Sequence, residues 1–178
     1  MTKLKGKVIW ITGASSGIGE ALTYELAKRD NKLILSSRRK EELERVKGNC
    51  PAEAQANIRI LPLDLSQSDI LKLSAEAAIQ LFGHVDVLIN NGGISQRSLA
   101  KETILDVDRK VMEVDYFGQI ALTKSLISHF IERKQGHYVT VTSITGKVGT
   151  PYRTGYSAAK HALHGFFDAL RAELWNES

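Results

Sequence analysis

The chain has 178 residues and a net charge of +4, and 43% of its residues are hydrophobic. This composition is ordinary for a globular protein and allows one domain with a substantial core, here residues 1–178. No apolar run is long enough to span a bilayer, and a single cysteine, Cys50, excludes an intrachain disulfide. Basic residues are dispersed, without interleaved aromatics, so we expect a cytoplasmic protein without a nucleic-acid or membrane partner.

Apolar, β-branched runs alternate with helical patterns along the chain. The sequence predicts strands over residues 8–12, 32–36, 58–61, 85–90 and 138–142. It predicts helices over residues 17–29, 40–47, 66–82, 105–133 and 152–175. Ser66 or Ser68 would cap the third helix, and the fourth would break near Gly118. Continuously apolar strands separated by helices are typical of a parallel sheet covered on both faces. We therefore predict an α/β fold, a doubly wound Rossmann sheet of strand order 3-2-1-4-5.

A glycine-rich turn, residues 12–19, joins the first strand to the first helix. At this place a nucleotide-binding fold needs Gly13 for the turn, Gly17 for close approach to a pyrophosphate, and Gly19 for tight packing of the helix. The helix N-terminus adds free N–H groups and partial positive charge. A simple turn is the alternative, but the placement between strand and helix favours a nucleotide site.

The second strand ends without an acidic residue, and Arg38 and Arg39 follow it. In dinucleotide-binding folds an acid here accepts from the ribose 2′-hydroxyl, whereas an arginine accommodates a 2′-phosphate. We therefore expect NADP(H) to be preferred, with NAD(H) as the alternative cofactor. A solvated arginine pair that starts a helix is the alternative reading of the motif.

Polar residues also follow the third and fourth strands, at the sheet edge where ligands bind. Asp64 precedes Leu65 and could cap the next helix, accept from an adenine amino group, or do both. The run from Asn90 through Asn91 and Gly92 to Gly93 ends the fourth strand, and its glycines allow backbone to approach a ligand closely. An ordinary Asn-Gly turn is the alternative.

Tyr156 and Lys160 lie four residues apart in the last predicted helix, so both side chains share one face. A phenol beside an ammonium is a general acid/base for alcohol or carbonyl chemistry, because the positive charge favours the phenolate. Ser143 ends the fifth strand, and if the intervening loop folds back its hydroxyl would hold the substrate oxygen.

Together these motifs, in this order and at this spacing, resemble the short-chain dehydrogenase/reductase family along the whole chain. The resemblance implies reversible hydride transfer between NAD(P)(H) and an alcohol or carbonyl. It implies Tyr156 as acid/base, Lys160 as ribose ligand beside it, and Ser143 as the group that polarises the carbonyl. The implied cofactor-binding residues are Gly13, Ser15, Ser16, Gly17, Ile18, Gly19, Arg38, Arg39, Asp64, Leu65, Asn91, Gly92, Tyr156 and Lys160.

Two departures from the family pattern bear on activity. Asp115 stands where the family usually has an asparagine whose backbone carbonyl holds a water of the proton relay. Its carboxylate could pair with Lys160, which predicts reduced but not absent catalysis. The chain also stops at Ser178, before the last strands and the substrate-covering loop of the family, so we expect a truncated form whose fifth strand is a sheet edge.

The sequence thus predicts an NADP(H)-dependent oxidoreductase acting on CH–OH donors or the matching carbonyls. The rival is a weakened or inactive NADP(H)-binding or interaction protein of the same fold, favoured by Asp115 and the short C-terminus. A homodimer or homotetramer is expected from the resemblance, through the two long helices after the fourth and fifth strands. Neither the substrate nor the direction of reaction follows from the sequence.

Overall fold

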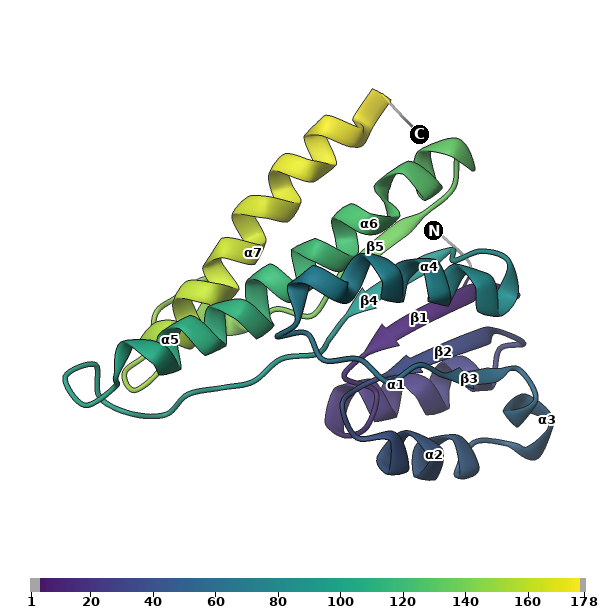
Figure 1. Ribbon diagram of the computed structural model, residues 1–178, viewed down its shortest axis with the longest axis horizontal. Helices are drawn as coiled ribbons and strands as arrows, with labels where there is room; N and C mark the ends of the chain where they lie inside the picture. Colours follow the sequence, from purple (N-terminus) through teal and green to yellow (C-terminus); the bar gives the residue numbers. More distant parts are fainter. Residues whose placement is uncertain (1–3, 177–178) are drawn as a thin grey trace.

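Five parallel strands form the centre of the computed structural model, which describes residues 4–176 (Figure 1). The strands are β1 (Val8–Thr12), β2 (Lys32–Ser36), β3 (Ile58–Ile60), β4 (Val87–Asn90) and β5 (His137–Thr140). Their order in the sheet is β3-β2-β1-β4-β5, and every neighbouring pair is parallel. The predicted doubly wound parallel sheet and its strand order are therefore confirmed.

Helices connect the strands, as βαβ crossovers require. They are α1 (Gly17–Ala27), α2 (Lys40–Gly48), α3 (Ala52–Gln55), α4 (Leu71–Phe82), α5 (Leu105–Met112), α6 (Gly118–Glu132) and α7 (Thr154–Glu173). The sequence pattern missed α3, a single turn after Pro51 that is too short to show periodicity. Within residues 4–176, no helix has the length and apolarity that a membrane crossing needs.

The predicted cap of the third helix is wrong. A 3₁₀ turn over Ser68–Ile70 comes first, and α4 starts at Leu71 without a side-chain cap. Asp64 Oδ1 accepts from the backbone N–H and the hydroxyl of Ser66, at 2.9 and 2.8 Å. Ser66 is thus held in a tight turn at the end of the β3 connection, away from the helix start.

The helix predicted over residues 105–133 is interrupted. Glu113–Phe117 forms a π-helical segment between α5 and α6, and Asp115 lies within it. At Gly118, which begins α6, a β-carbon would lie 2.2 Å from the carbonyl oxygen of Leu65. Such π-helical turns often occur at functional sites, and this one brings Asp115 toward the sheet edge.

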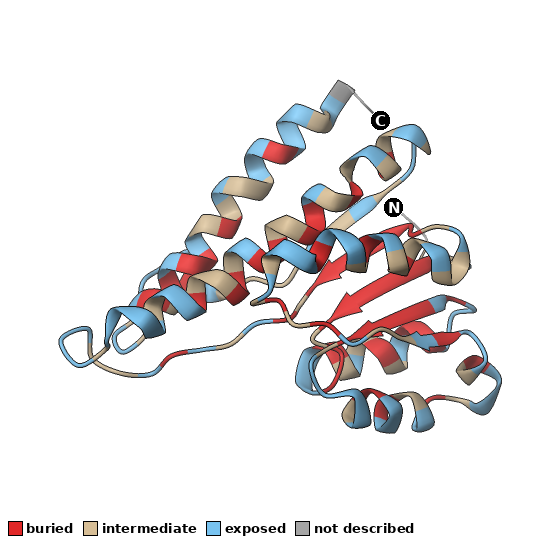
Figure 2. Ribbon diagram, in the orientation of Figure 1, coloured by how far each residue is buried: buried red, intermediate tan, exposed pale blue. Residues whose placement is uncertain are grey.

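The strands alternate their side chains between two apolar layers. On one face Val8, Trp10 and Leu88 pack under α4 and α6. On the other face Ile9, Ile11 and Leu33 pack under α1 and α2. Because both faces are covered, β1 and β4 are entirely buried, as Figure 2 shows. Packing on both faces of the sheet holds the carboxyl ends of the strands in fixed positions.

Like β3, β5 lies at an edge of the sheet, as the sequence predicted for β5. Its residues alternate between exposed and half-buried, and Val139 is 42% exposed. Tyr138 faces the layer of α6, where its hydroxyl donates to the carbonyl of Thr123 at 3.0 Å. Within the described residues, therefore, only one face of β5 is well covered.

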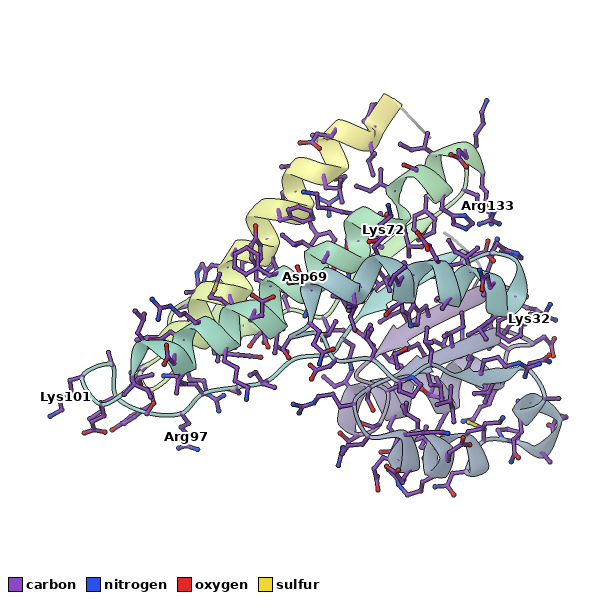
Figure 3. The ribbon with its side chains drawn as sticks, in the orientation of Figure 1. Lys32, Asp69, Lys72, Arg97, Lys101 and Arg133 are labelled. Carbon is purple, nitrogen blue, oxygen red and sulfur yellow. The ribbon has the colours of Figure 1, made fainter. Side chains whose placement is uncertain are left out.

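A buried carboxylate joins β1 to the end of α6. Asp86 is 5% exposed and accepts from the Val8 N–H and from Arg133 (labelled in Figure 3), each at 2.9 Å. Burial opposes ionisation of Asp86, but these donors outweigh it and lower the pKa below the ordinary value of 3.8. Ionised Asp86 thus contributes fully to the unfolding free energy at pH values above 3.8. This contribution is lost as the pH falls through the lower pKa that Asp86 has in the folded protein.

We therefore expect the unfolding free energy to fall as the pH is lowered from about 5 to about 2, and to fall less in Asp86→Asn. Urea unfolding at a series of pH values measures this difference. Asp168→Asn is the control, because the Asp168 side chain is 64% exposed in its pair with Arg171. If the unfolding free energy of Asp86→Asn fell with pH as steeply as that of the native chain, Asp86 would not be the group responsible.

Candidate active site

A cavity of about 310 Å³ opens at the carboxyl ends of β1, β2 and β4. This volume is within the range of small-molecule and cofactor sites. The predicted cofactor-binding residues that line the cavity are Gly13, Ser15, Ser16, Arg38, Arg39, Asp64, Leu65, Asn91 and Gly92. Gly17, Ile18 and Gly19 instead form the first turn of α1. Four chain segments far apart in sequence therefore meet at the predicted place.

Two glycines of the turn, Gly13 and Gly19, leave no room for a side chain. A β-carbon on Gly13 would lie 2.7 Å from the Gly92 Cα, and one on Gly19 would lie 2.3 Å from the Gly13 carbonyl oxygen. α1 therefore packs directly against the turn. A helix N-terminus in this setting is suited to phosphate groups.

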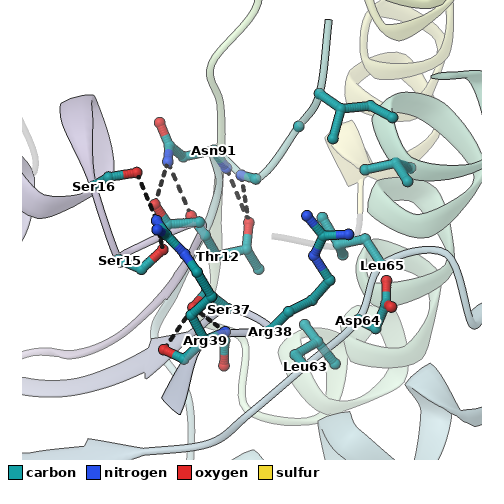
Figure 4. Close-up of a pocket in the computed structure, with 16 residues that line it drawn as sticks. Thr12, Ser15, Ser16, Ser37, Arg38, Arg39, Leu63, Asp64, Leu65 and Asn91 are labelled. Carbon is teal, nitrogen blue, oxygen red and sulfur yellow. Dashed lines mark hydrogen bonds between the residues drawn. The ribbon is translucent and has the colours of Figure 1, made fainter. Parts of the chain in front are cut away.

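Thr12 locks the ends of β1 and β4 together. Its hydroxyl oxygen accepts from the N–H groups of Asn91 and Gly92, each at 3.0 Å. The Asn91 amide in turn donates to the carbonyls of Thr12 and Gly13, at 3.0 and 3.2 Å (Figure 4). The sequence analysis did not predict this role of Thr12. Its place directly before Gly13 was the only sequence feature that indicated it.

The two arginines after β2 point in different directions (Figure 4). Arg39 donates to the hydroxyls of Ser15 and Ser16, at 3.2 and 3.4 Å. Arg38 extends toward Leu65 and Asp64. Burial opposes ionisation of Asp64, but the bonds from Ser66 and the charge of Arg38 lower the pKa of Asp64 overall. Both cations border the cavity, and a 2′-phosphate bound there would meet positive charge.

Asp115 and Lys160 form a buried ion pair. The Lys160 Nζ lies 3.5 Å from Asp115 Oδ2, and the two side chains are only 4% and 0% exposed. Asp115 Oδ1 accepts from the Ile94 N–H at 2.7 Å, while Lys160 donates to the Val141 carbonyl at 3.3 Å. Burial raises the pKa of Asp115, against the opposing effects of the Ile94 N–H and of Lys160. Since Ile94 lines the cavity, the pair connects the cavity edge to α7.

Tyr156 lies beside this pair. The Lys160 Nζ and the Arg153 guanidinium carbon each lie 5.6 Å from the centre of the Tyr156 ring. Arg153 also donates to the hydroxyl of Ser95, in the loop after β4. That bond holds the Arg153 guanidinium next to the Tyr156 ring as a second cation. The sequence analysis did not predict this cation, because Arg153 belongs to no motif.

Ser143 ends the loop after β5 and caps a 3₁₀ turn, where its hydroxyl oxygen accepts from the N–H and the hydroxyl of Thr145 at 3.2 and 3.0 Å. The loop packs against α7, because a β-carbon on Gly146 would lie 2.9 Å from the carbonyl oxygen of Lys160. The loop thus folds back onto the helix that carries Tyr156. Ser143, Tyr156 and Lys160 lie outside the lining of the cavity.

The parallel sheet, the glycine turn and the cavity at the carboxyl ends of the strands define a Rossmann nucleotide-binding fold, and α7 carries Tyr156 beside Lys160. The sequence profile described as short chain dehydrogenase matches residues 7–178, and the chain belongs to that family. Its members bind nicotinamide cofactors, and the residues around the cavity fit such a group.

Among curated proteins, the chain is 51% identical to human dehydrogenase/reductase SDR family member 7 over 175 residues, which cover 97% of this chain and 52% of the relative. It is 44% identical to mouse dehydrogenase/reductase SDR family member 7B over 174 residues, covering 96% of this chain and 54% of the relative. The chain therefore spans about half the length of the curated relatives it matches.

Solved structures give the same assignment. A short chain dehydrogenase/reductase from Burkholderia phymatum in complex with NAD superposes with a TM-score of 0.91 at 26% identity, over 100% of this chain and 63% of that one. A short-chain dehydrogenase from Streptomyces avermitilis superposes with a TM-score of 0.90 at 29% identity, over 98% and 63% of the two chains.

Proposed function

We propose that this protein is an NADP(H)-dependent oxidoreductase that interconverts an alcohol and a carbonyl compound, with Tyr156 as the acid/base. The observation that carries the proposal is the position of Lys160, whose ammonium lies 5.6 Å from the Tyr156 ring and is fixed by burial. A cation held there stabilises negative charge on the phenol oxygen, which a proton donor to a developing alkoxide requires.

In this reaction the residues of the site would bind the cofactor, orient the substrate and transfer the proton. A bound nicotinamide cofactor would supply or accept the hydride. The glycine turn and the start of α1 hold the phosphates, and Asn91 and Gly92 hold the end of β4 against them. Tyr156 transfers the proton at its phenol oxygen, and Ser143 orients the substrate oxygen beside it.

The preference for NADP(H) rests on Arg38 and Arg39 at the cavity wall. Nicotinamide fluorescence titrations of the purified chain measure the Kd values of NADPH and NADH. We expect tighter binding of NADPH, and we expect Arg38→Gln to weaken NADPH binding by about tenfold or more while NADH binding changes little, because a charge-assisted phosphate contact is lost. Equal Kd values for the two cofactors in the native chain would contradict the preference.

A second candidate function is cofactor binding with weakened or no catalysis. The ion pair between Asp115 and Lys160 favours it, because the carboxylate neutralises the charge that Tyr156 needs. Binding of NADPH without turnover of any compound in a broad carbonyl and alcohol screen would support this candidate over the first.

We propose further that two copies associate through α5, α6 and α7. Leu105 and Phe117 are 60% and 45% exposed on this helical layer, and apolar side chains of that size favour an interface. Analytical ultracentrifugation distinguishes a monomer from a homodimer or homotetramer.

A further inference from the structure

A single guanidinium joins α2 to the glycine turn. Arg45 donates to both carboxylate oxygens of Glu20, at 2.8 and 3.1 Å, and to the backbone carbonyl of Ser15 at 3.3 Å. It also donates to Glu42 on its own helix at 2.9 Å. The bidentate geometry makes the contact with Glu20 stronger than an ordinary surface pair.

Glu20 lies in the first turn of α1, where its N–H donates to the Ser16 carbonyl at 3.4 Å. Its side chain is only 20% exposed, and bonds from Arg45 and Tyr24 lower its pKa to about 2. The carboxylate is therefore charged at every physiological pH. A fixed negative charge at this helix N-terminus opposes the binding of phosphate groups, because the positive end of α1 is the feature that attracts them.

We infer that Arg45 is a positioning residue of the cofactor site, which holds the Ser15 turn and neutralises Glu20 so that the N-terminus of α1 remains attractive to a pyrophosphate. The inference rests on the proposed function, because it concerns the same dinucleotide site. Arg45 lies outside the cavity lining and acts through Glu20 and Ser15. Its effect is the same for both nicotinamide cofactors, because they share the pyrophosphate.

The test compares Kd values of NADPH and NADH, by fluorescence titration, in Arg45→Gln and in Arg45→Gln combined with Glu20→Gln. We expect Arg45→Gln to raise both Kd values about three- to tenfold, with an unchanged ratio between the cofactors. High salt should reduce the effect, because dissolved ions partly screen the uncompensated Glu20 carboxylate from the pyrophosphate. The double variant should return both values close to those of the native chain, since the uncompensated carboxylate is gone.

Glu42→Gln is the matched control, since it removes the other ion pair of Arg45 and leaves Glu20 and Ser15 in contact with it. Circular dichroism verifies that each variant is folded, and Glu20→Gln alone is expected to bind both cofactors at least as tightly as the native chain. If adding Glu20→Gln to Arg45→Gln did not restore the Kd values, the electrostatic role of Arg45 would be overturned. If Arg45→Gln left both Kd values unchanged, the inference about Arg45 would be overturned, while the proposed function would stand. If the native chain bound neither cofactor, the proposed function would fall and this inference with it.

Discussion

Tyr156→Phe is expected to lower turnover by about 10²- to 10⁴-fold, the range for loss of a general acid/base, while the Kd of NADPH stays unchanged. Phenylalanine keeps the ring that lies 5.6 Å from both Arg153 and Lys160, so packing at the start of α7 is preserved. Only the oxygen that exchanges the proton is removed. Steady-state absorbance of the reduced nicotinamide, with the carbonyl substrate found by screening, measures the loss.

Tyr152→Phe is the control for this variant. Tyr152 lies in the same segment and is 50% exposed, so removing its hydroxyl tests for a non-specific effect of the substitution. Turnover by Tyr156→Phe at the native rate would exclude Tyr156 as the acid/base. Loss of NADPH binding together with turnover would show instead that the hydroxyl serves the cofactor site.

Asp115→Ala is expected to destabilise the protein by about 3–5 kcal/mol, because it leaves the Lys160 ammonium buried without a counter-charge. Lys160 is 3% exposed and retains only the Val141 carbonyl as a hydrogen-bond acceptor among the described residues. The Ile94 N–H also loses its acceptor. Chemical unfolding with urea measures the change as a lower midpoint at constant slope.

Asp115→Asn separates charge from packing at the same position. The amide oxygen can still accept from Ile94, so we expect a smaller loss of stability than in the alanine variant. Because the carboxylate no longer pairs with Lys160, the ammonium acts more fully on Tyr156, and turnover should rise. Unchanged turnover in Asp115→Asn would refute the idea that this carboxylate weakens catalysis.

The sequence motifs brought most of the predicted cofactor-binding residues to the lining of one cavity, because local chain order places them at the ends of the strands. A glycine turn between a strand and a helix places N–H groups at the sheet edge whatever the rest of the chain does. The strand order followed from the alternation of apolar runs and helices. The N-cap at Ser66 or Ser68 was wrong because Asp64, an earlier residue, takes the Ser66 N–H in a turn that the helical pattern does not reveal.

The sequence by itself predicted the parallel sheet, because apolar strands alternate with helices along the chain. It also determined the glycine turn and the spacing of Tyr156 and Lys160, because each of these depends on residues close together in the chain. Only the tertiary structure decided that a π-helical segment carries Asp115 to 3.5 Å from Lys160, and that Arg45 reaches the carboxylate of Glu20. Those pairs join residues 45 and 25 positions apart, respectively. Contacts between such distant residues depend on how helices pack over the sheet, and the free energy of burying a charge depends on that packing.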